Sequence, residues 1–466
     1  MIKSLCIVTK NAKFKIFLDN RSFFMYHLSC KNKRCANQRH IFYCSYNVKY
    51  FTKYENKSSV KMINVNQARE IILKHILPVK EAQFLNLNFC LGRVSAVDIK
   101  SRENIPPFDN SAMDGFAIKA FNSIGALPDN PKVFAVIADL AAGYTAAKTV
   151  RNNQAMRIMT GAPIPDGADS VVMVEDTASN EGRKEFVRIF REVKKGENVR
   201  YAGEDVKKSE IVIKKGDILK SGYIGMLASL GISKVKVFRQ PKVAILATGD
   251  ELVEIKEKLT PGKIHNSNTY SLGAQVQSAG ALAVVLGIAR DKKEELRRKI
   301  RKGLSFDMLL VSGGISVGDY DFVKDVLKEL GTTIKFWRVA MKPGKPLAFG
   351  MMERVPVFGL PGNPVSSMIT FEQFVRPAIL KMAGRREIFR FHLPAIAKDD
   401  FKKKKKLRYF LRVVLENQNG ALYASLTGPQ GSGILKSMVL ANGIMELAEG
   451  LENLRAGDKV QVTYLD

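Results

Sequence analysis

Residues 308–322 read MLLVSGGISVGDYDF, in which glycines, a serine and two aspartates directly follow an apolar run. Such a run is typical of a strand that is buried on both faces of a parallel sheet. Gly313 and Gly314 allow the backbone to turn sharply or to approach a ligand, and helical periodicity begins after them. Because a glycine turn before a helix exposes backbone N–H groups, this stretch predicts an anion site.

Asp319 and Asp321 lie beside this predicted anion site. Carboxylates near a bound phosphate are expected chiefly where a cation, or a substrate proton, stands between the two negative groups. The alternative is that both aspartates only cap the following helix. The segment alone leaves both interpretations open.

Three other predicted strands end in similar residues, with the sequences ATGDEL, ARD and GLPGNP. In an open α/β sheet, ligands bind at the carboxyl ends of the strands. One crevice is therefore expected to collect the acidic residues Glu251, Asp291, Asp319 and Asp321 and the basic residues Arg338, Lys342 and Lys345. Lysines suit phosphate and carboxylates suit a divalent metal, so the mixture favours a phosphorylated substrate bound with a metal ion.

The elements that must position these residues change character along the chain. From residue 241 strands alternate with helices, which predicts right-handed βαβ units and an open parallel sheet. Residues 93–205 consist of short alternating runs broken by Gly, Pro and Asn, typical of β structure. The predicted architecture is multidomain α/β: a linking domain (62–92 and 206–240), a β-rich domain (93–205), an α/β domain (241–390) and a C-terminal β domain (391–466).

Residues 1–61 differ in composition from the rest. They hold 13 Lys/Arg against 2 Asp/Glu, a net +11 (13 − 2) of the chain's +29, and include Cys6, Cys30, Cys35 and Cys44. Cys30, Cys35, His40 and Cys44 are of zinc-ligand type, in a spacing reminiscent of a zinc knuckle that does not match one. Since Met62 opens a good amphipathic helix, we interpret 1–61 as an extension that is disordered or stems from a wrongly assigned start.

Several classes of function lack support. The sequence contains no P-loop, no GxGxxG and no HExxH. No apolar run reaches the roughly 20 residues of a membrane span. Cys90 is the one cysteine after residue 61, which points to a cytoplasmic protein without a disulfide framework. The lysine excess fits a solvated surface, and nucleic-acid binding is the weaker alternative.

Seven segments together resemble the molybdopterin molybdenumtransferases, the family of MoeA and the gephyrin E domain. They read PPFDNSAMDGFAI, RIMTGAPIPDGADSVVM, AGEDV, ATGDEL, VSGGISVGDYD, MKPGKPLAFG and GLPGNPVSS. The resemblance covers residues 62–466 and implies an α/β domain similar to molybdopterin adenylyltransferase. It further implies a cytoplasmic homodimer that uses Mg²⁺ or another divalent cation to cleave adenylylated molybdopterin, inserts molybdenum from molybdate and releases AMP.

The resemblance also assigns residues. It implies catalytic roles for Asp321, Asp319, Glu251, Asp109, Asp205, Lys342 and Lys345, and metal binding by Glu251, Asp291 and Asp321. It also implies substrate binding by Ser111, Asp114, Thr160, Ser312, Gly313, Gly314, Ser316, Arg338, Pro361, Gly362, Asn363, Pro364 and Ser432. By resemblance, the FDNSAMDGF and MTGAP residues reach the cleft of the partner subunit.

Structural alternatives stay open for some of these residues. Asp114 and Gly115 could form a plain turn, Thr160 could be a buried turn hydroxyl, and LPGNP could only shape the start of a helix. Alternatives also stay open for function: a molybdopterin adenylyltransferase, or a scaffold without catalysis. FDNSAMDG argues against the first, since a lone adenylyltransferase domain lacks it, and the intact acidic set argues against the second. Because no adenylyltransferase domain is fused here, a separate molybdopterin adenylyltransferase is expected.

Overall fold

The computed structural model describes residues 3–8, 12–19, 22–30, 62–180, 183–314 and 322–465. The chain divides into two compact units, Met1–Val60 and Lys61–Asp466. The first unit contains an antiparallel sheet of β1 (Lys3–Val8), β2 (Ala12–Asp19) and β3 (Ser22–Cys30), in a segment interpreted above as an extension. Whether residues 1–61 are needed by the rest of the chain stays a prediction.

A six-stranded sheet forms the centre of the α/β region, in the order β19-β16-β20-β24-β23-β21. The first four of these strands are parallel, which confirms the predicted core of βαβ units. Their bounds are β16 (Lys242–Thr248), β19 (Leu282–Ala289), β20 (Met308–Ser312), β24 (Val355–Leu360), β23 (Ala348–Met352) and β21 (Thr333–Phe336).

The sheet departs from the predicted parallel arrangement at one edge. Strands β23 and β24 pair antiparallel, with Met352 opposite Val355, and β21 pairs antiparallel with β23. Only Glu353 and Arg354 connect β23 to β24, and Glu353 has a φ of 50°. So short a connection cannot cross over the sheet, so the two strands form a hairpin.

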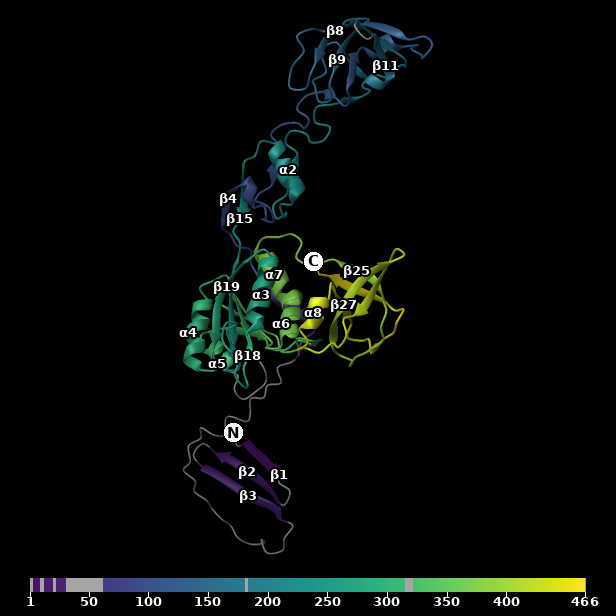
Figure 1. Ribbon diagram of the computed structural model, residues 1–466. Coiled ribbons are helices and arrows are strands. Elements are labelled where there is room, and N and C mark those ends of the chain that lie inside the picture. The colour runs from purple at the N-terminus through teal and green to yellow at the C-terminus, as the bar shows by residue number, and fades with distance from the viewer. Residues whose placement is uncertain are drawn as a thin grey trace. The chain divides into compact units, whose positions relative to one another are not determined.

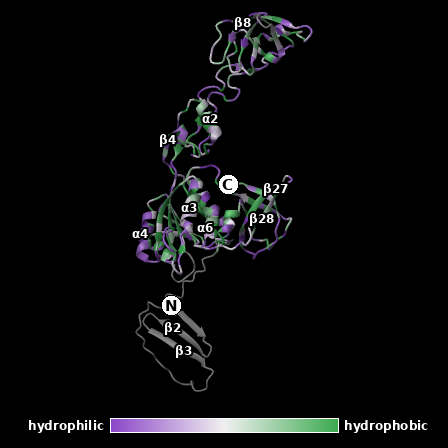
Figure 2. Ribbon diagram, in the orientation of Figure 1, coloured by the Kyte–Doolittle hydropathy of each residue, from purple (hydrophilic) through white to green (hydrophobic). Residues whose placement is uncertain are grey.

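Residues of the central strands alternate between two apolar layers. Val243 and Ile245 of β16 pack in the layer of α3 (Ser267–Ser278), whereas Ala244 and Leu246 pack in the layer of α4 (Lys293–Gly303) and α5 (Phe322–Glu329). Helices therefore cover both faces of the sheet (Figure 1). The outer side of α4 is hydrophilic, as expected for a helix with one buried stripe (Figure 2).

Helix α1 (Val65–His75) begins where the sequence indicates, because Asn64 and Gln67 form a reciprocal capping box.

The helix predicted after GLPGNP is continuous but not uniform. It runs through α6 (Pro364–Thr370), a π-helical turn η5 (Phe371–Val375) and α7 (Arg376–Met382). Helices α1, α3, α6 and α7 share one core with the sheet.

The C-terminal β region closes on itself. Strands β27 (Arg408–Gln418), β28 (Ala421–Leu426), β25 (His392–Ala397), β31 (Lys459–Tyr464) and β29 (Gly443–Leu447) pair in this order, and β29 also pairs with β27. Such a ring leaves no free edge among its members. Strand β22 (Met341–Lys342) joins β27 from outside the ring, so the MKPGKP segment is attached to this barrel. Helix α8 (Lys436–Leu440) and the pair β26 (Phe401–Lys402) and β30 (Asn453–Leu454) complete it.

The β-rich region has its own sheet of six strands, in the order β10-β7-β9-β8-β12-β11. Two further pairs, β15 with β4 and β14 with β5, bring residues after 210 back against residues before 101. The remaining bounds are β4 (Ala82–Asn86), β5 (Ile99–Lys100), β6 (Asn110–Ser111), β7 (Gly115–Ile118), β8 (Lys132–Leu140), β9 (Gln154–Ile158), β10 (Ser170–Met173), β11 (Thr177–Asn180), β12 (Arg183–Ile189), β13 (Val199–Arg200), β14 (Ile211–Ile213), α2 (Ser221–Ser229), β15 (Lys234–Phe238), β17 (Leu252–Val253) and β18 (Ile264–His265). In the described ranges, no helix has the length and apolar character to cross a membrane.

Candidate active site

The carboxyl ends of the parallel strands meet at one edge of the α/β sheet, as predicted. Ser312, the last residue of β20, is in register with Ala247 of β16 and Leu360 of β24. The Gly313 N–H donates to the Leu360 carbonyl over 3.0 Å, and the Gly249 N–H donates to the Ala289 carbonyl over 3.3 Å. The segments beginning at 249, 290, 313 and 361 therefore start side by side.

The glycine turn after β20 is required by its surroundings. Gly313 has a φ of +94° and Gly314 a φ of +61°. A Cβ on Gly313 would lie 2.4 Å from the Thr248 carbonyl oxygen, and one on Gly314 would lie 2.7 Å from Thr248 Oγ1. The turn passes directly over the end of β16, where only glycine fits.

A buried polar cluster lies under this turn. Asn268, near the start of α3, donates from Nδ2 to Ser312 Oγ over 2.9 Å and to the Gly362 carbonyl over 2.8 Å. Among the described residues, Asn268 Oδ1, Thr248 Oγ1 and Ser367 Oγ are buried without a hydrogen-bond partner. Buried polar atoms are normally satisfied, so three orphans at one edge indicate a place where a ligand completes the network.

Carboxylates gather at the neighbouring strand ends. The Asp291 N–H donates to Asp250 Oδ1 over 3.1 Å, and the Glu251 carboxylate folds back over Gly249. Burial raises the pKa of Asp291, and the negative charges of Asp250 and Glu251 raise it further. Repulsion of this kind is what a bound cation would relieve. In the described part of the chain, however, no group of three acidic, His or Cys side chains is close enough to hold a metal ion.

Three predicted residues, Ser316, Asp319 and Asp321, lie outside the described residues. The predicted metal set of Glu251, Asp291 and Asp321 is therefore described only in its first two members, and it stays a prediction. The same holds for the choice between a metal-binding and a helix-capping role of the two aspartates.

A basic cavity of about 560 Å³ opens beside the MKPGKP segment. It is lined by Lys342, Pro343, Phe401, Lys402, Lys403, Lys404, Tyr409, Leu411, Arg412, Gln430 and Gly431. These eleven described residues include five cations and no carboxylate. The ammonium groups of Lys342 and Lys403 lie 5.6 and 5.4 Å from the centroid of the Tyr409 ring. A cavity with this charge is suited to a small oxyanion.

Arg412 is the most deeply buried cation of this cavity, with no exposed surface. Its guanidinium donates to Ser437 Oγ over 3.1 Å and to the carbonyls of Phe410 and Gly431 over 3.4 and 3.2 Å. Because these partners are neutral, burial is not offset by a carboxylate and lowers the pKa of Arg412 to about 10. A guanidinium has five N–H groups, so these three bonds leave some of its donors available to an anion.

The basic cavity and the sheet edge are connected by short contacts. The Val365 N–H at the start of α6 donates to the Ser432 carbonyl over 3.2 Å, and Ser432 follows Gly431 of the cavity. Lys342 and Lys345 are exposed on either side of buried Pro343 and Gly344, and Arg338 is partly buried. Asn363 occupies the N-cap of α6 with no side-chain capping bond, followed by Pro364 at the first turn. Pro361 and Gly362 therefore lead from the sheet edge to the wall of the cavity.

The FDNSAMDGF and MTGAP segments are brought together in the β-rich region. Asp114 Oδ1 accepts from the Thr160 N–H and from Thr160 Oγ1, both over 2.7 Å. Asp109 Oδ1 accepts from the Ala202 N–H over 2.7 Å, and Ser111 Oγ donates to the Met113 carbonyl over 2.5 Å. Thr160 is exposed, so the alternative of a buried turn hydroxyl is wrong. Asp205 is also exposed, and its N–H donates to the Ile105 carbonyl.

Three family models match successive parts of the chain. The MoeA N-terminal region (domain I and II) matches residues 63–231, a probable molybdopterin binding domain matches 244–381, and the MoeA C-terminal region (domain IV) matches 394–465. Molybdopterin molybdenumtransferase of Haemophilus influenzae is 37% identical over 405 residues, covering 86% of this chain and 98% of the relative. The chain belongs to the MoeA family of molybdopterin molybdenumtransferases.

Other relatives agree with this assignment. Molybdopterin molybdenumtransferase of Bacillus subtilis is 36% identical over 393 residues, covering 84% of this chain and 91% of the relative. The crystal structure of the molybdopterin biosynthesis MoeA protein from Pyrococcus horikoshii OT3 superposes with a TM-score of 0.76 at 32% identity, covering 87% of this chain and all of that one. The fold and the transferase class expected from the resemblance are thereby confirmed.

Sequence reasoning missed several residues of this MoeA-family site. The sequence analysis singles out neither Asn268 nor Asp250, although Asp250 directly precedes Glu251. Arg412 stands in the sequence RYFLRVVL, where a charge inside an otherwise apolar strand was the available signal. No local sequence pattern marks Tyr409 or Lys403 as a site residue. Both come close to Lys342 only because β22 pairs with β27.

We expect the contribution of Arg412 to oxyanion binding to depend on pH. Below about pH 10 the guanidinium is charged, and as pH rises through about 10 the folded protein releases the proton that attracts the anion. At pH 8 Arg412→Gln should bind molybdate roughly 10- to 100-fold more weakly than wild type, as for one charge-assisted hydrogen bond. The ratio of the two affinities, measured by calorimetry, should fall toward one above pH 11. A ratio that is constant with pH would contradict this role.

A second expectation concerns Asp114. Hydrogen bonds from Thr160 lower the pKa of Asp114 below its usual 3.8, so its stabilising effect is present above pH 3.8 and is lost as pH falls through the lower, folded value. Asp114→Asn should therefore melt below wild type at pH 7, with the gap closing at acid pH. Thermal melts from pH 7 to 2 test this, with exposed Asp129→Asn as the control. An equal gap at every pH would show that the charge is irrelevant.

Proposed function

We propose that the chain inserts molybdenum from molybdate into adenylylated molybdopterin, cleaving the pyrophosphate link and releasing AMP. The observation that carries the proposal is the basic cavity, whose described lining holds five cations and no carboxylate. Molybdate is a small tetrahedral dianion, and Lys342 and Arg412 supply the charge and donors that such an oxyanion needs. Membership of the family named for this transfer supports the same substrate.

The pterin substrate would lie along the adjoining sheet edge. The Gly314 N–H and the Ser312 hydroxyl would face its phosphates, because the Gly313 N–H is already bonded to the Leu360 carbonyl. Ser316, Lys345 and Arg338 would be further contacts. The orphaned oxygens of Asn268 and Thr248 are acceptors for the amino and N–H groups of the pterin ring. The 361–364 turn leads from there to the cavity, so the dithiolene end of the substrate would approach the molybdate near Ser432.

A divalent cation fits the chemistry of the neighbouring carboxylates. Asp250, Glu251 and Asp291 are hard oxygen donors, and the raised pKa of Asp291 marks a local excess of negative charge. Asp321 would join the predicted metal ligands Glu251 and Asp291, with Asp319 beside it. When bound, Mg²⁺ would neutralise the negative charge that develops on the pyrophosphate.

We also propose a homodimer in which the β-rich region serves the cleft of the partner subunit. Asp109, Asp114, Thr160 and Asp205 are exposed, whereas Ser111 is buried between them. The bonds that hold Asp109 and Asp114 leave one oxygen of each carboxylate available. The substrate would be supplied by a separate molybdopterin adenylyltransferase, and both steps are assigned to the cytoplasm.

The test is an in vitro reaction of the full chain with adenylylated molybdopterin, molybdate and Mg²⁺, followed by AMP release. We expect AMP only when molybdate and Mg²⁺ are both present, and little from Asp321→Asn even though this variant retains the substrate. Incubation with ATP and unmodified molybdopterin is the control for adenylyltransferase activity. Formation of adenylylated molybdopterin in that control, or AMP release by Asp321→Asn with ordinary cation dependence, would overturn the proposal.

A further inference from the structure

The loop that carries Arg338, Lys342 and Lys345 is closed at its base. We call residues 338–345 the cation loop. The Val339 N–H donates to the Lys345 carbonyl over 3.0 Å, so the two ends of the loop are tied together. Val339 is fully buried in the apolar core, whereas Lys342 and Lys345 are exposed. The backbone of this loop therefore decides where Lys342 meets the basic cavity.

One edge of the cation loop is held by the C-terminal barrel. Strand β22 pairs with the start of β27, and the Arg408 N–H donates to the Ala340 carbonyl over 2.9 Å. The pairing sets Lys342 opposite Tyr409 and places the Lys342 ammonium 5.6 Å from the centroid of the Tyr409 ring. The barrel thus fixes the loop from one side only.

The other edge of the cation loop is held by the residues just before α1. Ile63 forms a parallel bridge with Val339. Its N–H donates to the Arg338 carbonyl over 3.3 Å, and its carbonyl accepts from the Ala340 N–H over 2.8 Å. Without Ile63 these two backbone groups would lose their partners next to buried Val339, which is unfavourable. We call residues 62–66 the strap.

A side-chain contact ties the strap to the barrel as well. Arg408 Nη1 donates to Asn66 Oδ1 over 3.0 Å and to Glu446 Oε1 over 2.8 Å. The Nε and Nη2 groups of Arg408 donate to Glu449. Because the Arg408 backbone holds the cation loop and its side chain holds the strap, the two supports of the loop are also fixed to each other.

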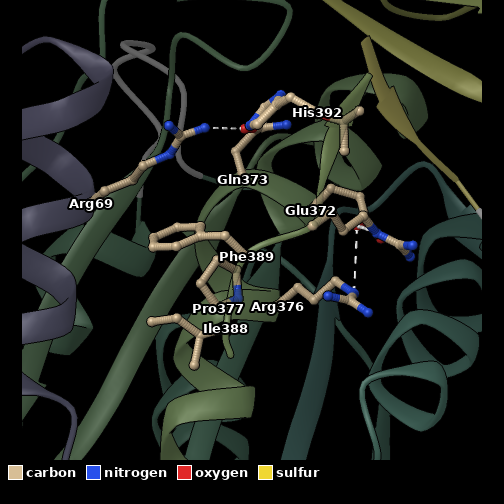
Figure 3. Close-up of a pocket in the computed structure, with 10 residues that line it drawn as sticks. Arg69, Glu372, Gln373, Arg376, Pro377, Ile388, Phe389 and His392 are labelled. Atoms are coloured by element: carbon tan, nitrogen blue, oxygen red, sulfur yellow. Dashed lines mark hydrogen bonds and ion pairs between the residues drawn. The ribbon is translucent and has the colours of Figure 1, made fainter. Parts of the chain in front are cut away.

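Helix α1 anchors the far end of the strap. Val65 and Ala68 are fully buried against the core of the α/β sheet. One turn into the helix, Arg69 donates to the side chain of Gln373 in η5, as Figure 3 shows, beside a cavity of about 340 Å³ that shares no residue with the basic cavity. The Arg69 guanidinium also lies 5.9 Å from the centroid of the Phe389 ring. The strap therefore leaves a helix that is fixed on several sides.

We propose that Ile63 and Asn66 are positioning residues of the oxyanion site, because the strap sets where the cation loop presents Lys342. The inference rests on the proposed function, in which Lys342 binds molybdate. Neither strap residue lines the basic cavity, so their effect passes through the loop. Moving a reacting or binding group by about 1 Å can cost about 100-fold in rate even when the mutated residue is remote.

The experiment is a calorimetric titration of the full chain with molybdate. Ile63→Pro removes the N–H that bonds Arg338 and should weaken binding about tenfold. Asn66→Ala removes a partner of Arg408 and should weaken binding about threefold, the size of one modest hydrogen bond. Asn66→Asp keeps an acceptor for Arg408 and should bind as wild type does. Asn130→Ala, the same truncation at an exposed position of the β-rich region, is the matched control.

Repeating the titrations in Lys342→Gln, over a higher range of molybdate, separates positioning from a general loss of folding. In that background Ile63→Pro should add less than about twofold, because coupled residues are not additive. Equal losses in both backgrounds, or wild-type affinity in both Ile63→Pro and Asn66→Ala, would overturn the inference while leaving molybdenum insertion intact. A wild-type chain that binds no molybdate would overturn the proposed function, and this inference with it. Melting curves check folding, and Asn66→Ala decides the result if Ile63→Pro does not fold.

Discussion

Lys342→Gln should lower kcat/KM for AMP release by about 100- to 1,000-fold, the size of effect seen when one preorganised electrostatic donor is removed from an active site. The Lys342 side chain is exposed at the basic cavity and faces the Tyr409 ring, so its charge is available to substrate. The stability of the fold should change little, because the substitution removes an exposed charge and no core contact.

Lys256→Gln is the matched control for this loss, since Lys256 is also an exposed lysine and lies outside both cavities. Initial rates over a range of molybdate concentrations would show whether the defect lies in binding the oxyanion or in turnover. Should Lys342→Gln retain the rate of Lys256→Gln at low molybdate, the basic cavity would not be the oxyanion site.

Gly313→Ala should destabilise the α/β domain by about 3 kcal/mol, through a left-handed backbone that L-residues avoid and a clash in a close-packed place. The added Cβ would meet the Thr248 carbonyl oxygen at 2.4 Å, and β16 cannot retreat because it is paired on both sides. Denaturant unfolding followed by fluorescence of Trp337, which packs in the same core, measures the change.

Gly362→Ala provides the comparison on the adjacent turn. Its φ is not positive, and the nearest atom to the new Cβ is Gly313 Cα at 3.8 Å, so the cost should stay below about 1 kcal/mol. If the two glycines proved equally tolerant, the close passage of the 313–314 turn over β16 would be refuted.

The sequence alone was sufficient for the elements whose signals are local. Asn64 and Gln67 begin α1 through contacts three residues apart, and Val243 to Leu246 form a strand buried on both faces because all four are apolar. The parallel order of such strands brings the segments after Thr248, Ala289, Ser312 and Leu360 to one edge, so the meeting of these four segments could be predicted.

Only the tertiary structure decided which distant groups meet. Asn268 reaches Ser312 and Gly362 across 44 and 94 residues, and Lys342 meets Tyr409 because β22 pairs with β27. Arg412 has a lowered pKa because the closed barrel buries it among neutral carbonyls, and Arg69 joins Glu372 and Arg390 through the packing of α1 against η5 and α7. Desolvation and charge balance depend on these long-range neighbours, which no local pattern of residues specifies.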